Sequence, residues 1–65
     1  MKINELTTTQ QEYLKTLVDP NDPTKLYRLG SYVYYPSWDN SIDIDGAFTA
    51  DELEAIATFM RAHDK

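Results

Sequence analysis

The segment FTADEL, residues 48–53, carries the strongest folding signal in this chain, because it combines two features of a helix start. Thr49 followed three residues later by Glu52 is a capping box, and Phe48 with Leu53 has the pattern of a hydrophobic staple. The apolar residues that follow recur at helical spacing and form one stripe: Leu53, Ile56, Ala57 and Met60, widened by Phe59. The sequence therefore predicts a helix from about residue 50 to about residue 62.

A shorter helix is expected near the N-terminus. The three threonines at positions 7–9 are all candidate caps, because each is followed three residues later by Gln or Glu, and the spacing leaves open which one caps the helix. The helix would bury one apolar stripe: Tyr13, Leu14, Leu17 and Val18. Asp19-Pro20 should end it, because a residue before proline avoids the helical region. The run DPNDPT, residues 19–24, is then expected to be a turn or short loop.

Residues 25–35, KLYRLGSYVYY, change the composition to one typical of strands, with four tyrosines and a valine. Gly30-Ser31 in the middle allows two interpretations, a tight turn between two strands or a bulge within one bent strand. Residues 36–40 are predicted to be a loop. The next five residues, 41–45, alternate strictly, which predicts a half-buried strand with Ile42 and Ile44 on one face and the acidic residues on the other.

These elements predict an α+β fold in the order α–β–β–α, with an antiparallel hairpin or three-stranded meander packed against two helices. The 65 residues are expected to form a single domain, 1–65, whose small core gives a net stability of roughly 3–5 kcal/mol. The chain contains no cysteine, so neither a disulfide nor a thiolate metal site supports the fold. No signal-peptide pattern and no run of about 20 apolar residues is present, and we expect a cytoplasmic protein without membrane contact.

A cluster of carboxylates is the sequence feature that points beyond the fold. No Lys or Arg lies between Arg28 and Arg61, and the formal net charge of the chain is -5. The carboxylates of this interval are Asp39, Asp43, Asp45, Asp51, Glu52 and Glu54. Such a segment can recognise a positive surface, bind a cation or serve as an ordinary solvated face.

The string SIDIDGAFTADEL, residues 41–53, also resembles the calcium loop of an EF-hand. The resemblance implies a ligand set of Ser41, Asp43, Asp45 and Glu52, with glycine at the sixth loop position. Three departures oppose it: the first ligand is a serine, two isoleucines occupy loop positions that normally face water, and the preceding segment holds a proline and several aromatic residues. The alternative is that the isoleucines belong to a strand and Glu52 caps a helix.

Several function classes are disfavoured. The pair Asp43 and Asp45 has no cleft to act in, His63 lies near the C-terminus, where fraying is expected, and no phosphate-binding glycine loop is present, so we expect no enzymatic activity and no cofactor. The tyrosine-rich run resembles a base-stacking platform, but such platforms work beside a basic groove, and the downstream chain is acidic. Direct nucleic-acid binding is therefore not expected.

The favoured hypothesis is a small acidic protein-binding module whose partner has a basic surface. The six carboxylates would supply its anionic face, and Tyr34, Tyr35 and Trp38 would serve as apolar anchors, since Tyr and Trp are enriched at interfaces. In size, acidity and lack of cysteine the chain is similar to phage-encoded inhibitors of the anti-CRISPR and anti-restriction type. That resemblance implies a DNA mimic that blocks a nucleic-acid-binding surface. The alternatives are the calcium-binding module and a self-associating subunit, such as a homodimer.

Overall fold

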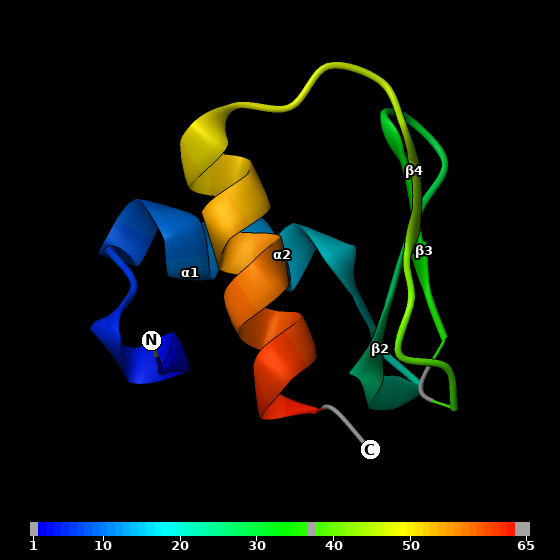
Figure 1. Cartoon of the computed structure of the whole chain (residues 1–65), viewed down its shortest axis with the longest axis horizontal. Helices are drawn as coiled ribbons and strands as arrows, with labels where there is room; N and C mark the ends of the chain where they lie inside the picture. Colours follow the sequence, from blue (N-terminus) through cyan, green and yellow to red (C-terminus); the bar gives the residue numbers. More distant parts are fainter. Residues whose placement is uncertain (1, 37, 64–65) are drawn as a thin grey trace.

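The computed structural model describes residues 2–36 and 38–63 and confirms an α+β fold, in which two helices pack together beside a four-stranded antiparallel sheet (Figure 1). A 3-10 helix, η1 (Ile3–Glu5), precedes α1 (Thr8–Leu17). Strands β1 (Val18–Asp19), β2 (Asp22–Arg28), β3 (Tyr32–Tyr35) and β4 (Asp43–Asp45) follow in that order across the sheet, and α2 (Ala50–Ala62) comes last. The sheet has more strands than the hairpin or three-stranded meander expected from the sequence.

Both helices begin at capping boxes. In α2 the Thr49 hydroxyl accepts from the Glu52 N–H at 3.1 Å, and the Glu52 carboxylate accepts from the Thr49 N–H at 2.8 Å. In α1 the cap is Thr7, which exchanges the equivalent pair of hydrogen bonds with Gln10 at 3.1 and 3.0 Å. The predicted α2 is confirmed, and the open choice among three threonines is resolved in favour of the first.

The predicted loop over DPNDPT is mostly wrong. Helix α1 ends at Leu17, and only Pro20 and Asn21 form the turn between β1 and β2. The residues on either side of this turn belong to strands, because Val18 pairs with Leu26, which is fully buried. The register of β1 against β2 shifts between its two pairs, and proline at position 23 falls within this irregular stretch, where a missing N–H is tolerated.

Residues 29–31 form a turn between β2 and β3, so the turn interpretation of Gly30-Ser31 is confirmed and the bulge is wrong. Strand β3 pairs on its other side with β4, the last strand of the meander. The predicted strand at 41–45 is therefore present as three residues. Ser37, part of the predicted loop at 36–40, lies outside the described residues.

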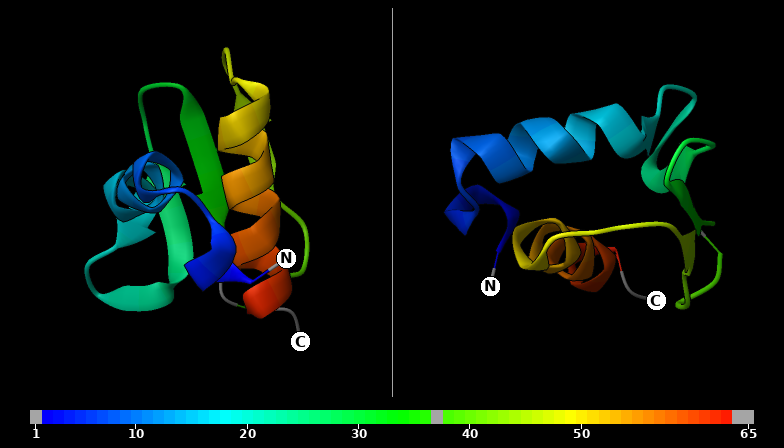
Figure 2. Two further views of the ribbon diagram at one scale, coloured as in Figure 1. Left: turned by 90° about the vertical axis from the view of Figure 1, so that its left-hand side faces the viewer. Right: turned by 90° about the horizontal axis from the view of Figure 1, so that it is seen from above.

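The core lies between the helices and one face of the sheet. It is formed by buried residues from every layer: Leu6, Leu14, Leu17, Leu26, Val33, Tyr35, Ala55, Ile56 and Phe59. The Tyr35 ring meets the Phe59 ring edge-on, with centroids 6.2 Å apart, and this contact joins β3 to α2. Figure 2 shows both helices on the same side of the sheet, with α1 crossing α2 steeply. Among residues 2–36 and 38–63, no helix lies on the other face of the sheet (Figure 2).

The buried side of α2 differs from the predicted stripe. Ile56 and Phe59 are buried as expected, but Leu53 is 43% exposed and Ala57 is exposed. The helix is turned toward α1, because Gln10 of α1 donates hydrogen bonds to groups in the first two turns of α2. Within the described ranges, no helix is long and apolar enough to cross a bilayer.

Candidate functional site

The face of the sheet that points away from the helices brings tyrosines and carboxylates together. Tyr34 of β3 lies opposite Tyr27 of β2 on one side and opposite Asp43 of β4 on the other, and Tyr32 lies opposite Asp45. Directly opposite side chains share a face, and the β3 residues between them are core residues, so all five project outward. We call these five residues the open sheet face.

The three rings of the open sheet face form one aromatic cluster. The Tyr27 ring meets those of Tyr32 and Tyr34 edge-on, with centroids 6.4 and 6.1 Å apart. Tyr27 is 43% exposed, and the other two are half-buried. The Lys25 ammonium lies 5.5 Å from the centroid of Tyr34 and 3.8 Å from a carboxylate oxygen of Asp19. These contacts therefore hold the three rings against one another while part of their surface stays open to solvent.

The carboxylates beside this cluster form no ion pair within the described residues. Asp43 and Asp45 are both exposed, and within residues 2–36 and 38–63 none of the six carboxylates of the acidic segment forms an ion pair. Asp39 instead accepts from the backbone N–H of Ser41 at 3.2 Å and from its hydroxyl at 3.1 Å, which fixes the loop before β4. The open sheet face thus presents two uncompensated negative charges next to three aromatic rings.

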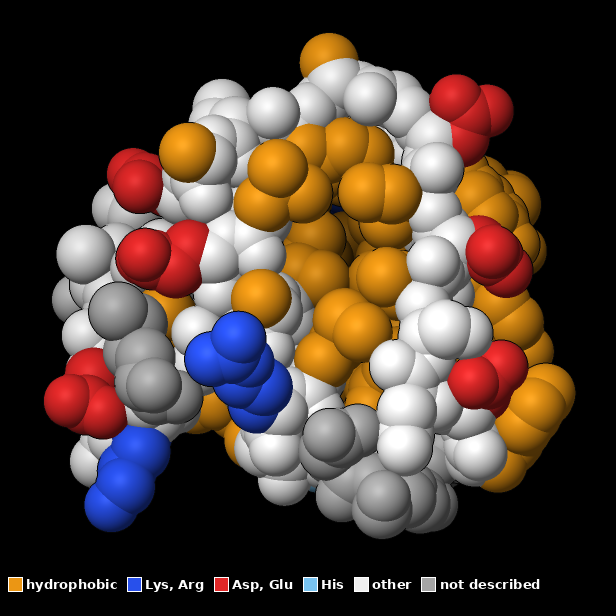
Figure 3. Space-filling model, viewed as in Figure 1, with side chains coloured by type: hydrophobic (Ala, Val, Ile, Leu, Met, Phe, Trp, Pro, Cys, Tyr) orange, Lys and Arg blue, Asp and Glu red, His pale blue; other side chains and the backbone are white. Residues whose placement is uncertain are grey.

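The remaining candidate carboxylates lie elsewhere. Asp51, Glu52 and Glu54 are in the first turns of α2, which belongs to the helical side of the molecule (Figure 1). Figure 3 shows an apolar hollow between α2 and the strands, with acidic groups to either side of it. The sequence cluster is therefore split into two groups, one on β4 and its preceding loop and one at the start of α2.

The three predicted aromatic anchors differ in their exposure to solvent. Tyr34 belongs to the open sheet face, and Trp38, in the loop after β3, is 73% exposed. Tyr35 is only 1% exposed and donates from its hydroxyl to the Met60 carbonyl at 3.5 Å. Its expected role as an anchor is wrong, because alternation along β3 turns it into the core.

The calcium-loop interpretation does not fit the observed backbone. Asp43 and Asp45 lie in an extended strand paired with β3, and Glu52 closes the capping box of α2. An EF-hand loop would have to wrap these oxygens and that of Ser41 around one point. Among the described residues, no group of three or more acidic or histidine side chains is placed to hold a metal ion. The strand and capping interpretation is the one that the structure shows.

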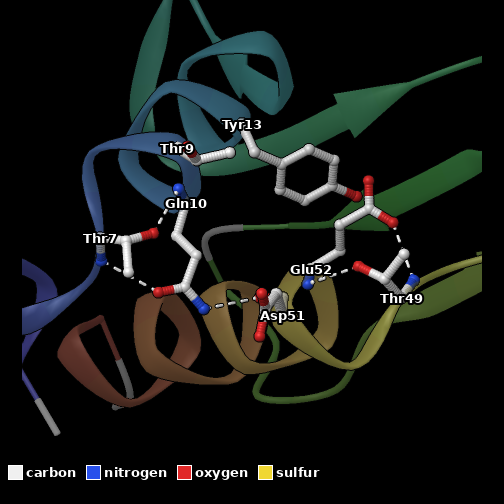
Figure 4. A pocket seen from close by; sticks show the side chains of 7 residues that line it. All are labelled: Thr7, Thr9, Gln10, Tyr13, Thr49, Asp51 and Glu52. Carbon is white, nitrogen blue, oxygen red and sulfur yellow. Dashed lines mark hydrogen bonds between the residues drawn. The ribbon is translucent and has the colours of Figure 1, made fainter.

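A small polar hollow of about 230 Å³ lies between the first turns of α1 and α2 (Figure 4). Gln10, which is 5% exposed, spans it: its amide nitrogen donates to the Asp51 carbonyl and to the Glu54 carboxylate, both at 2.9 Å. Its amide oxygen accepts from Thr7. The Gln10 side chain therefore ties the start of α1 to the first turns of α2.

Tyr13 lines the same hollow, and its ring points toward the Glu52 side chain (Figure 4). Among the described residues its buried hydroxyl has no hydrogen-bond partner. Burial raises the pKa of Tyr13 above its ordinary value of 10.0, and the negative charge of Glu52 raises it further. The positive charge of the Arg28 guanidinium, 5.5 Å from the ring centroid, lowers the pKa of Tyr13 and partly offsets these two effects.

Tyr13→Phe should make folding less sensitive to alkaline pH. The raised pKa leaves stability unaffected below the pKa of the unfolded chain, and stability falls as the pH rises through the folded pKa. The urea midpoint of the wild type should therefore fall further than that of the variant between about pH 9 and about pH 11. The other tyrosines ionise in both proteins and cancel in the comparison. Parallel losses in the two proteins would contradict this account.

Sequence reasoning missed Tyr27 and Tyr32 as surface residues, and it missed Gln10 as a buried link. A hairpin register centred on the 29–31 turn would have placed both tyrosines on the sheet face that points away from the core. No family model matches the chain, and neither curated proteins nor solved structures include one that resembles it significantly. The geometry of the open sheet face is therefore the feature of this chain that indicates a function.

Proposed function

We infer that this chain is a protein-binding module that docks its open sheet face onto a basic surface of another protein. The observation that carries the proposal is the presence, on a sheet face that no helix covers within the described residues, of three tyrosines and of two carboxylates without an ion pair there. Tyrosine is amphipathic and enriched among the residues that dominate binding energy, and edge-on contacts with Tyr27 hold the rings of Tyr32 and Tyr34 in place.

Asp43 and Asp45 would supply the charge complementarity. On an extended strand they are about 6.6–7 Å apart at the backbone and project the same way. Neither has to give up an ion pair within the described residues in order to meet a partner's Lys or Arg. Charges of this kind increase association rates and select against acidic partners.

The more specific proposal is inhibition of a nucleic-acid-binding protein in the cytoplasm. Its basic groove would receive these carboxylates where phosphates otherwise lie, in the manner of a DNA mimic, and the tyrosines would pack against the stems of its Lys and Arg side chains. No enzymatic step is required, and none is proposed.

The test is a comparative capture experiment with Asp43→Asn/Asp45→Asn. Immobilised wild type and variant are incubated with cell lysate at low and high salt, and the retained proteins are quantified by mass spectrometry. A specific partner should be retained about tenfold less by the variant and less at high salt, because both changes weaken charge pairing. Duplex DNA should displace the partner if it binds nucleic acid through the same surface.

Glu5→Gln/Glu12→Gln is the matched control, because it removes two exposed carboxylates from the helical side of the molecule. This control should retain the partner as the wild type does, and circular dichroism should show all three proteins folded. Equal retention by both variants at both salt concentrations would overturn the proposal.

A further inference from the structure

Helix α2 exposes an apolar stripe beside its buried side. Leu53, Ala57 and Met60 lie at positions i, i+4 and i+7 and so follow one line along the helix. Leu53 is 43% exposed, Ala57 is exposed, and Met60 is half-buried and packs against the core. An amphipathic helix normally turns such a stripe fully toward its own core, but here most of it stays exposed.

The molecular surface is hollowed and apolar between α2 and the strands (Figure 3). Ala57 and Met60 of the stripe line a hollow of about 170 Å³ together with Arg61 and with Asn40 of the loop before β4. Ile44 shares the core face of the sheet, because it lies opposite a buried valine of β3, yet it is 42% exposed. The sheet is thus also left uncovered at this edge.

A second copy of the chain meets an obstacle at the β4 edge and at the open sheet face. Pairing two β4 edges would place Asp43 and Asp45 beside the same residues of the partner, and like charges across a strand pair are destabilising. Two open sheet faces would oppose the same carboxylates. The apolar stripe carries no carboxylate, so self-association is directed to it.

We propose that two copies associate through α2, packed antiparallel across Ala57 about a two-fold axis. Small residues at a crossing point let two helices approach closely, at the short end of the usual 8–10 Å between axes. The symmetry then places Met60 of each copy against Leu53 of the other, because they lie on opposite sides of Ala57 along the same stripe. The hollow receives apolar side chains from the second copy.

The same arrangement matches charges. Glu54 and Arg61 follow a line beside the stripe, one near each end of the helix; one oxygen of Glu54 accepts from Gln10, and the residue is otherwise exposed, as Arg61 is. The two-fold axis brings Arg61 of each copy to Glu54 of the other, which forms two equivalent pairs. In an antiparallel pair the partly positive N-terminal end of each helix also lies beside the partly negative C-terminal end of the other, which is favourable. The open sheet face lies on the other side of the molecule and stays free in both copies, so the dimer would bind a partner bivalently.

Sedimentation velocity of the whole chain over a concentration series tests the association. The wild type should shift from monomer to dimer as its concentration rises. Ala57→Arg inserts a long charged side chain at the crossing point and should weaken the dimer at least about tenfold. Ala62→Arg is the control, because it adds the same charge to another exposed position of α2 and should leave the dimer intact.

Charge reversal tests the orientation. Arg61→Glu should weaken the dimer about tenfold, because it brings two carboxylates together in each of the two equivalent pairs, whereas Arg61→Lys keeps the charge and should retain the dimer. A wild type that stays monomeric at every concentration would sink the proposal. So would a dimer indifferent to Ala57→Arg or to Arg61→Glu. These results are independent of partner capture by the open sheet face.

Discussion

Leu26→Ala is expected to leave the chain largely unfolded at room temperature. Leu26 is fully buried in the centre of β2, opposite Val18 on one side and Tyr35 on the other. Truncating a fully buried leucine costs roughly 2–5 kcal/mol, because transfer energy is lost and a cavity remains. A domain of this size has only about 3–5 kcal/mol of net stability. The two quantities are comparable, so little folded protein should remain.

Urea titration followed by circular dichroism measures this effect. The variant should lack a native baseline, whereas the wild type should show a cooperative transition. Leu29→Ala is the matched control, because this leucine is 74% exposed in the turn between β2 and β3, and its loss should change stability by less than about 0.5 kcal/mol. A midpoint for Leu26→Ala close to that of the control would mean that the sheet does not form the described core.

Gly46→Ala should have the next largest effect, a loss of about 1–3 kcal/mol from backbone strain and crowding. The φ angle of Gly46 is 147°, a conformation that side-chain-bearing residues rarely adopt. A Cβ atom there would also lie 3.0 Å from the Cα of Ser31, in the turn between β2 and β3. The variant should therefore loosen the end of β4 from that turn.

Gly30→Ala provides the comparison, because a Cβ atom at Gly30 would meet nothing within 4 Å. This change should be neutral or slightly stabilising, since alanine restricts the unfolded chain. Thermal melts of the two variants should thus move in different directions or by clearly different amounts. Equal shifts would show that the contact between Gly46 and Ser31 does not hold β4 in place.

The helices could be predicted from the sequence because their starting signals are local. A threonine and a Glu or Gln three residues later specify hydrogen bonds within one turn, and both capping boxes form as the spacing indicates. The side of α2 that is buried could not be predicted in the same way. It is decided by Gln10, more than forty positions earlier, whose amide holds the first turns of α2 against α1.

The sheet shows a second limit of local reasoning. Asp22 and Pro23 have poor strand propensity, yet they open β2, because pairing with β1 and burial of Leu26 outweigh that preference. Alternation correctly separated Ile44 from its acidic neighbours on β4. It could not show that the sheet side bearing Ile44 would lie beyond the reach of α2 and stay partly exposed.

The candidate site was predictable only in part. The carboxylates of β4 and Tyr34 were identified, whereas Tyr27 and Tyr32 needed the pairing register of β2 with β3, which depends on the choice between turn and bulge that the sequence left open at Gly30-Ser31. The acidic segment also looked continuous because its residues are neighbours along the chain. The connection at 46–49 carries the chain from β4 to α2, and this change of element separates the two halves of the segment in space.

The exposure of Trp38 to solvent has a consequence for fluorescence measurements. The chain contains one tryptophan, and its indole is already 73% exposed in the native state. Its emission should therefore resemble that of indole in water before and after denaturation, and it would be a poor reporter of unfolding. A blue shift on mixing with another macromolecule would instead signal that the loop after β3 has become covered.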